Sequence, residues 1–245
     1  MAVIPRSRVA VLSAPLGDVY AQLVLGTAPA NLIAYWPLSD ASGTTVADLS
    51  GNGRTGTYAG GPTLGQPGIG DGRTCAYFAG DDERADVFSA SLAAAFSFTE
   101  FSASLWCRMY ASSVWTDGSA RKALLIQSNG NPDFFLMRKS STNNKLGFWL
   151  RMNSNDYSTE VSVGESLGAE WFHIGFTSLA GGNAYRYING VEATHRSAVA
   201  AANGAARTVA TISEFGETWY GCIAHVALWS KQLTAVQMAA LASPP

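Results

Sequence analysis

Residues 32–56 read LIAYWPLSDASGTTVADLSGNGRTG, and this run decides the fold of the 245-residue chain. It opens with a short apolar and aromatic stretch that suits a buried β-strand. A loop follows in which an acid, an amide and repeated glycines favour turns. The run therefore predicts a strand that leads into a tight loop at the start of a β-domain.

Strand patterns continue along the rest of the chain. Every second residue from Phe101 to Met109 is apolar or small, as expected for a strand with one face in a core. The alternation returns in residues 146–152, and Asn189-Gly190 suits the type I′ turn of a hairpin. No long helical pattern separates the strands, so we expect an all-β domain with antiparallel sheets. A capping pattern at residues 234–237 predicts one short C-terminal helix.

The composition excludes several classes of partner. Charged residues make up 14% of the chain, and the net charge is -2. This leaves no basic surplus for nucleic acid. No apolar run approaches the roughly 18 consecutive residues that a membrane helix needs. We expect one main soluble domain that binds neither nucleic acid nor a membrane.

The cysteines and the N-terminus bear on the cellular compartment. Cys75, Cys107 and Cys222 cannot all pair within one chain, and each lies among apolar neighbours. We predict buried, reduced thiols, because their spacing matches no zinc motif. The apolar run after Arg8 is short and is soon interrupted by Pro15, so we predict no cleavable signal peptide.

Residues 1–31 differ from the strands that follow. Pro5, Pro15 and Pro29 divide them, and only residues 18–25 could form a short helix or strand with an apolar face. Such a segment is long enough to dock but too short to fold alone. We predict a docking arm over residues 1–31 and a globular domain over residues 32–245. The arm's partner is either its own domain or a neighbouring subunit.

Several segments, taken in order, resemble the laminin-G-like jelly rolls of the concanavalin A-like superfamily. Together they cover most of the chain from residue 32 to residue 241. They are the opening strand and loop, a core strand with an internal tryptophan, a later strand at residues 171–176 (WFHIGF), a hairpin at residues 185–190 (YRYING) and a closing strand before a short helix. The resemblance implies a concanavalin A-like sandwich of two antiparallel sheets. Its members usually bind or display surfaces and do not catalyse.

A narrower resemblance joins residues 19–38 to the openings of bacteriophage and bacterial surface proteins that carry this domain. It implies a virion protein that is made in the host cytoplasm without a signal and released by lysis. Synthesis in the reducing cytoplasm would also be consistent with unpaired cysteines. The alternative location is extracellular.

The family resemblance also implies a calcium site in the opening loop, at Asp48, Asn52 and Gly53. Calcium needs several oxygen ligands at once, which a carboxylate and backbone carbonyls can supply. Relatives commonly place an acid just after the isoleucine of the closing strand, but here Ala224 follows Ile223. The alternative is an Asx-type turn that needs no metal.

Candidate carbohydrate-binding residues lie on and near the strand at residues 146–152. Trp149 and Arg151 point away from its core face, and Trp115 and Tyr157 are near in sequence order. Flat aromatic rings beside hydrogen-bonding groups suit a sugar ring. The alternative for these residues is core packing or a subunit interface.

Catalysis has little support in the sequence. Related glycosidases need two or three carboxylates close together, and the nearest pair here, Glu214 and Glu217, flanks a predicted turn. His173, His195 and His225 are scattered and match no catalytic or metal motif. We predict that the protein is not an enzyme and requires no cofactor.

These observations lead to a non-enzymatic bacteriophage virion protein, either a decoration or a tail-associated component. Residues 1–31 would attach it to other virion subunits, within a homo-oligomer or a larger assembly, and the jelly roll would face host glycans. Removal of the arm should then abolish assembly and leave the domain folded. The alternative function is a secreted or surface carbohydrate-binding module, with Trp149, Arg151 and Tyr157 in its site.

Overall fold

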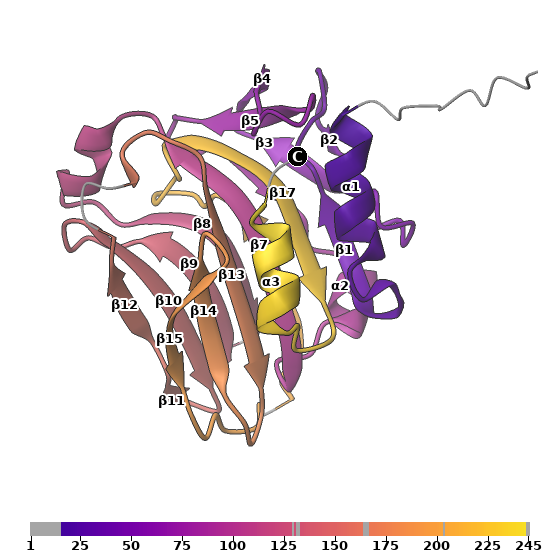
Figure 1. The fold of residues 1–245 in the computed structure, drawn as a ribbon, viewed down its shortest axis with the longest axis vertical. Coiled ribbons are helices and arrows are strands. Elements are labelled where there is room, and N and C mark those ends of the chain that lie inside the picture. The colour runs from indigo at the N-terminus through magenta and orange to yellow at the C-terminus, as the bar shows by residue number, and fades with distance from the viewer. Residues whose placement is uncertain (1–15, 129, 131–132, 164–166, 203, 244–245) are drawn as a thin grey trace, which may run out of the picture.

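The computed structural model describes residues 16–128, 130, 133–163, 167–202 and 204–243. Its strands form two antiparallel sheets that pack face to face (Figure 1). The jelly-roll sandwich predicted from the sequence is confirmed. Among these described residues, no helix is long and apolar enough to cross a membrane.

The first sheet has eight strands, in the order β15-β14-β13-β7-β17-β5-β4, and β1 also pairs with β17. Strand β17 is therefore the hub of this sheet, and all nine of its residues are buried. The bounds are β1 Leu32–Trp36, β4 Thr63–Pro67, β5 Thr74–Phe78, β7 Glu100–Met109, β13 Phe172–Leu179, β14 Ala184–Ile188, β15 Val191–Arg196 and β17 Gly221–Trp229.

The second sheet has nine strands, in the order β11-β10-β9-β8-β16-β6-β3-β2, and β12 also pairs with β10. Its centre is the meander of β8, β9 and β10. The bounds are β2 Thr45–Val46, β3 Gly56–Ala59, β6 Arg84–Asp86, β8 Arg121–Ser128, β9 Phe134–Lys139, β10 Lys145–Met152, β11 Asn155–Asp156, β12 Thr159–Ser162 and β16 Arg207–Ile212.

The main core lies between the two sheets. The alternating residues of β7 and β10 that the sequence predicted to face inward all belong to it: Phe101, Ala103, Leu105, Cys107, Met109, Leu146, Phe148, Leu150 and Met152. Phe101 of the first sheet meets Phe135 of the second with 5.1 Å between ring centroids. The period-two pattern therefore identified the correct core face of both strands.

The predicted hairpin and C-terminal helix are also confirmed. Asn189 and Gly190 have φ of 49° and 76°, as a type I′ turn requires. A Cβ on Gly190 would lie 2.9 Å from the Ala239 Cα, so only glycine lets the helix α3, Ala235–Leu241, pack this closely on the hairpin. The helix begins with a capping box between Thr234 and Gln237.

A second core lies on the outer face of the first sheet, under two helices. The helices α1, Leu16–Gly26, and α3 lie side by side across this face (Figure 1). They explain why β7 and β17 are buried on both faces. The buried residues of this second core are Tyr20, Ala21, Val24, Leu32, Tyr35, Cys75, Trp106, Tyr187, Cys222, Ala224, Ala227, Trp229, Leu233, Met238 and Leu241.

The hydroxyl of Tyr20 joins the three parts of this second core. It accepts a hydrogen bond from Trp106 Nε1 of β7 over 2.8 Å and donates to the Leu241 carbonyl of α3 over 2.6 Å. Burial raises the pKa of Tyr20 well above its usual value, so the phenol stays neutral and can donate. A further bond from Trp229 Nε1 to the Thr27 carbonyl, 2.7 Å, holds the end of α1.

Part of the predicted docking arm belongs to the folded domain. Of residues 1–31, the structure describes residues 16–31, and these pack on the chain's own sheet through α1 and the short 3-10 turn Pro29–Asn31. Own-domain docking was one of the two alternatives for the arm. Removal of residues 1–31 would uncover Trp106 and Trp229, so we no longer expect the truncated domain to keep its full stability. Residues 1–15 lie outside the described residues.

The substitution Tyr20→Phe should destabilise the fold by about 1–3 kcal/mol, because the buried Trp106 N–H and the Leu241 carbonyl both lose their partner. Urea unfolding followed by tryptophan fluorescence measures this change. The matched control is Tyr110→Phe, since the Tyr110 side chain is 62% exposed and its loss should cost little. Equal stability of the two variants would show that the Tyr20 hydroxyl does not hold the helices.

Candidate functional site

The first candidate surface is the outer face of β8, β9 and β10. On β10, Trp149 and Arg151 point away from the main core, as the alternation predicted. The register sets Trp149 beside Leu136 of β9 and Arg151 beside Phe134. Two of the predicted carbohydrate-binding residues therefore share one face with apolar neighbours from the next strand.

This face carries a shallow groove of about 210 Å³, which we call the Trp149 groove. Its apolar floor is the cluster of Leu125, Phe134 and Leu136, against which Trp149 packs. Its charged rim includes Lys122 and Glu217, whose side chains form an ion pair of 3.3 Å. The complete lining is Lys122, Leu125, Gln127, Phe134, Leu136, Arg138, Trp149 and Glu217.

Two arginines lie over aromatic rings along this face. The Arg138 guanidinium carbon lies 3.9 Å from the Trp149 ring centroid, and that of Arg151 lies 5.2 Å from the Phe134 ring. Gly147 makes room for the first pair, because a Cβ there would lie 3.1 Å from Trp149 Nε1 and 3.3 Å from Arg138 Cγ. The stacking fixes the guanidinium groups without using up their N–H donors.

Some of those donors lack a partner. Within the described part of the chain, Arg138 Nε and Arg151 Nε are buried atoms that make no hydrogen bond. Buried N–H groups without an acceptor are costly, and a bound hydroxyl or carbonyl would satisfy them. The surface thus pairs an apolar floor with unsatisfied donors.

The other two predicted carbohydrate-binding residues lie elsewhere. Trp115 is 1% exposed and donates from Nε1 to the Gly168 carbonyl over 2.7 Å, so it is a core residue and its assignment to a sugar site was wrong. Tyr157 packs against the main core, and its hydroxyl accepts from the Ala200 N–H over 2.9 Å. It does not line the Trp149 groove. For these two residues the packing alternative holds.

The loop predicted to bind calcium is closed by its own hydrogen bonds. One Asp48 carboxylate oxygen, Oδ1, accepts from the backbone of Tyr35 and Ser50 over 3.0 and 2.9 Å. The other, Oδ2, accepts from Ser50 Oγ and the Arg54 N–H over 2.9 and 2.8 Å. Asn52 donates from Nδ2 to the Leu32 and Ile33 carbonyls.

Gly53 of the same loop has φ of +67°, a left-handed conformation that favours glycine. These contacts match the Asx-type alternative for the loop. Elsewhere, the residues with described coordinates contain no cluster of three His, Cys, Asp or Glu side chains that could hold a metal. Calcium binding at Asp48, Asn52 and Gly53 stays the untested alternative to this turn.

Two predicted structural histidines are buried on the covered side of the first sheet. His225 is 1% exposed, and its ring joins Tyr35 Oη over 2.7 Å and Asp71 Oδ2 over 3.2 Å. His173 bonds Ser104 Oγ over 2.7 Å, and burial lowers its pKa to about 3. Both side chains are enclosed within the fold, as expected for structural histidines.

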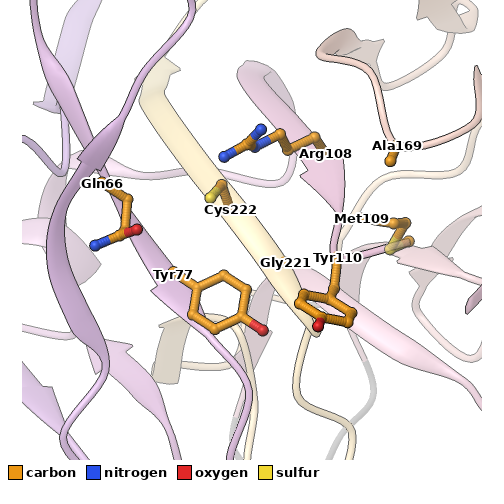
Figure 2. A pocket seen from close by; sticks show the side chains of 8 residues that line it. All are labelled: Gln66, Tyr77, Arg108, Met109, Tyr110, Ala169, Gly221 and Cys222. Atoms are coloured by element: carbon orange, nitrogen blue, oxygen red, sulfur yellow. The ribbon is translucent and has the colours of Figure 1, made fainter. Parts of the chain in front are cut away.

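The second candidate surface was not predicted from the sequence. It is a pocket of about 390 Å³ on the outer face of the first sheet, which we call the Cys222 pocket. Figure 2 shows its lining: Gln66, Tyr77, Arg108, Met109, Tyr110, Ala169, Gly221 and Cys222. Tyr77 of β5 and Arg108 of β7 both lie directly opposite Cys222 of β17, so the three side chains form one row across the sheet.

Electrostatics distinguish this pocket from the rest of the surface. The Arg108 guanidinium lies 5.3 Å from the Trp171 ring centroid, and among the described residues it pairs with no carboxylate. A hydrogen bond from Cys75 and the adjacent Arg108 together lower the pKa of Cys222 to about 7, although burial opposes the shift. All three cysteines are free and buried, as predicted.

Alternation along residues 101–110 already places Arg108 and Tyr110 opposite the core residues of their strand. That signal could have identified one wall of the pocket. The other wall depends on β5 and β7 being the two neighbours of β17, which the sequence alone does not specify.

Comparisons with solved structures find the same fold. The receptor-binding domain of botulinum neurotoxin C/D mosaic serotype matches with a TM-score of 0.69 and 15% identity over 87% of this chain and 51% of that one. The binding domain of Paraclostridial Mosquitocidal Protein 1 matches with a TM-score of 0.65 and 14% identity over 87% of this chain and 52% of that one. The chain thus spans about half the length of these structures.

A third structure concerns botulinum neurotoxin type C, whose cell entry is described as dependent upon interaction with two ganglioside molecules. It matches with a TM-score of 0.66 and 18% identity over 87% of this chain and 51% of that one. No curated protein matches the sequence. The family model for the concanavalin A-like lectin/glucanases superfamily matches residues 81–239, more than half of the chain. The chain therefore belongs to the concanavalin A-like lectin/glucanases superfamily.

Proposed function

We propose that this protein is a non-enzymatic, glycan-binding jelly-roll domain whose ligand lies in the Trp149 groove. The observation that carries the proposal is the stacked Arg138, which lines the groove and has an unsatisfied Nε, beside an apolar floor on the outer face of a sheet. An outer sheet face normally carries polar side chains. An apolar cluster there, with buried donors beside it, suits a ligand with both kinds of surface.

A sugar ring has both kinds of surface. Its C–H face would pack on Leu125 and Leu136, and its hydroxyl groups would accept from the Arg138 guanidinium. Gln127 and the ion pair of Lys122 and Glu217 offer further donors and acceptors at the rim. Because Arg138 covers one face of the Trp149 indole, the sugar would meet the indole's edge or its other face.

The structural relatives support glycan recognition in general terms. Two are named as receptor-binding or binding domains, and one is described through its interaction with gangliosides. Their identity to this chain is low and only about half of their length is shared, so they name no ligand for it. The ligand proposal rests on the groove itself.

Display on a bacteriophage particle remains a proposal based on the sequence resemblance. Synthesis in a host cytoplasm, a homo-oligomer or larger assembly, and contact with other virion subunits belong to the same proposal. Attachment through the arm would now fall to residues 1–15, outside the described residues, because residues 16–31 contact the chain's own sheet. The alternative stays a secreted or surface carbohydrate-binding module.

A glycan array tests the proposed function. The wild-type chain should bind a restricted set of glycans, and Trp149→Ala should weaken that binding by about tenfold or more, because both the indole and the support for Arg138 are lost. Arg138→Gln should have a similar effect on the same glycans. Phe88→Ala is the matched control, since Phe88 is 43% exposed and does not line the groove. Thermal melts confirm that each variant is folded.

If the wild type binds no glycan, or if Trp149→Ala and Phe88→Ala bind equally well, the Trp149 groove is not a glycan site. Binding that survives Arg138→Gln unchanged would also contradict the assignment of the guanidinium donors.

Calcium titration tests the remaining metal prediction. We expect chelator-treated protein to give no heat and no rise in melting temperature at millimolar calcium, because four hydrogen bonds already occupy the Asp48 carboxylate. A heat that is present in the wild type and absent in Asp48→Asn would instead establish calcium binding in this loop.

A further inference from the structure

We infer that the Cys222 pocket is a second ligand site, separate from the Trp149 groove, and that it binds a carboxylate-bearing sugar of the uronic acid class through Arg108. The two sites lie on the outer faces of different sheets, on opposite sides of the sandwich. The inference that the ligand is a sugar rests on the proposed function, which it extends to a second surface. The inference that the ligand carries a carboxylate rests on the pocket alone.

The pocket exists because the helical cover of the first sheet ends there. Under α1 and α3 the outer face of β17 is packed, whereas at the start of the strand Gly221, which has no side chain, and the small Cys222 form the floor of the pocket. Larger side chains from β5 and β7 rise on either side of this floor. Figure 2 shows Tyr77 and Tyr110 reaching toward β17 from its two flanking strands and the Arg108 guanidinium close to Cys222.

The charge of the pocket selects an anion. Arg108 is the cation that lines it, and none of the lining residues is acidic. A guanidinium group offers two parallel N–H donors that match a carboxylate, and Trp171 stacks against this one at 5.3 Å, which limits its motion. One cation among apolar and phenolic groups balances a single negative charge, so a monoanion suits it better than a phosphate dianion.

The remaining lining residues select a hydroxylated ring. Tyr77 and Tyr110 have ring centroids 6.1 Å apart with 55° between their planes, so they form a corner that an apolar ring face can contact. Their hydroxyls and the Gln66 amide can bond to sugar hydroxyls. Tyr110 is 62% exposed, so its ring and hydroxyl are open to a ligand in the pocket.

The thiol of Cys222 provides a reporter for occupancy. Arg108 stabilises the Cys222 thiolate, and a carboxylate bound to Arg108 would compete for that positive charge. Occupancy should therefore raise the pKa of Cys222 and also shield its sulfur. Both effects slow alkylation by iodoacetamide, which reacts with the thiolate.

The experiment measures the alkylation rate of Cys222 in the full chain by peptide mass spectrometry, from pH 6 to pH 9. Galacturonate at millimolar concentration should slow alkylation several-fold and move the pH midpoint upward. Its methyl ester, which has the same ring without the charge, and galactose should have little effect. The protection should disappear in Arg108→Gln and persist in Arg138→Gln, which alters the opposite face of the sandwich.

Equal protection by galacturonate and its methyl ester, equal protection by inorganic phosphate, or no protection at all would overturn the inference. The comparison of acid with ester uses the wild-type chain, so it decides the question even if Arg108→Gln does not fold. Failure of the Trp149 groove on the glycan array would leave these rates unaffected, so the two proposals fail independently.

Discussion

The fold depends on the burial of both faces of the first sheet, and the Tyr20 hydroxyl is the contact that secures it. This one group links α1 to β7 through Trp106 and to α3 through the Leu241 carbonyl. Without the two helices, the outer face of β7 and β17 would expose an apolar surface to water. The segment before the opening strand is therefore part of the domain from residue 16 onward.

The covering of the first sheet by α1 and α3 also determines which sheet surfaces remain open to a ligand. Most of the outer face of the first sheet is closed by helices, and the end that they leave open forms the Cys222 pocket. Among the residues that the structure describes, no helix covers the meander of the second sheet, and this meander carries the Trp149 groove. Each surface has an arginine stacked on a tryptophan, Arg138 on Trp149 and Arg108 on Trp171. Stacking holds the donor rigidly, which reduces the entropy lost when a ligand binds.

The sequence predicted what local patterns control. Period-two alternation identified the inward face of β7 and β10, and it placed Trp149 and Arg151 on the outer face. Turn and capping chemistry predicted the Asn189-Gly190 hairpin and the C-terminal helix. The family resemblance predicted the two-sheet architecture.

Features that depend on long-range pairing could not be predicted. Trp115 is close to Trp149 in sequence order, but it lies in the 3-10 turn Ser112–Thr116 and points into the core. The Cys222 pocket requires β5 and β7 to be the neighbours of β17. These strands are far apart in the sequence: Arg108 of β7 is 111 positions from Trp219, which lies just before β17. The contact between α1 and α3 joins residues that are 221 positions apart in the sequence. No periodicity in one segment contains that information.

Hydrogen–deuterium exchange of the full chain, with and without the glycan that binds best, shows whether the uncovered sheet faces bind the ligand. We predict slower exchange in β8, β9 and β10 on binding, and unchanged exchange in α1, α3 and the Asp48 loop. Protection confined to the helices or to residues 48–53 would contradict it.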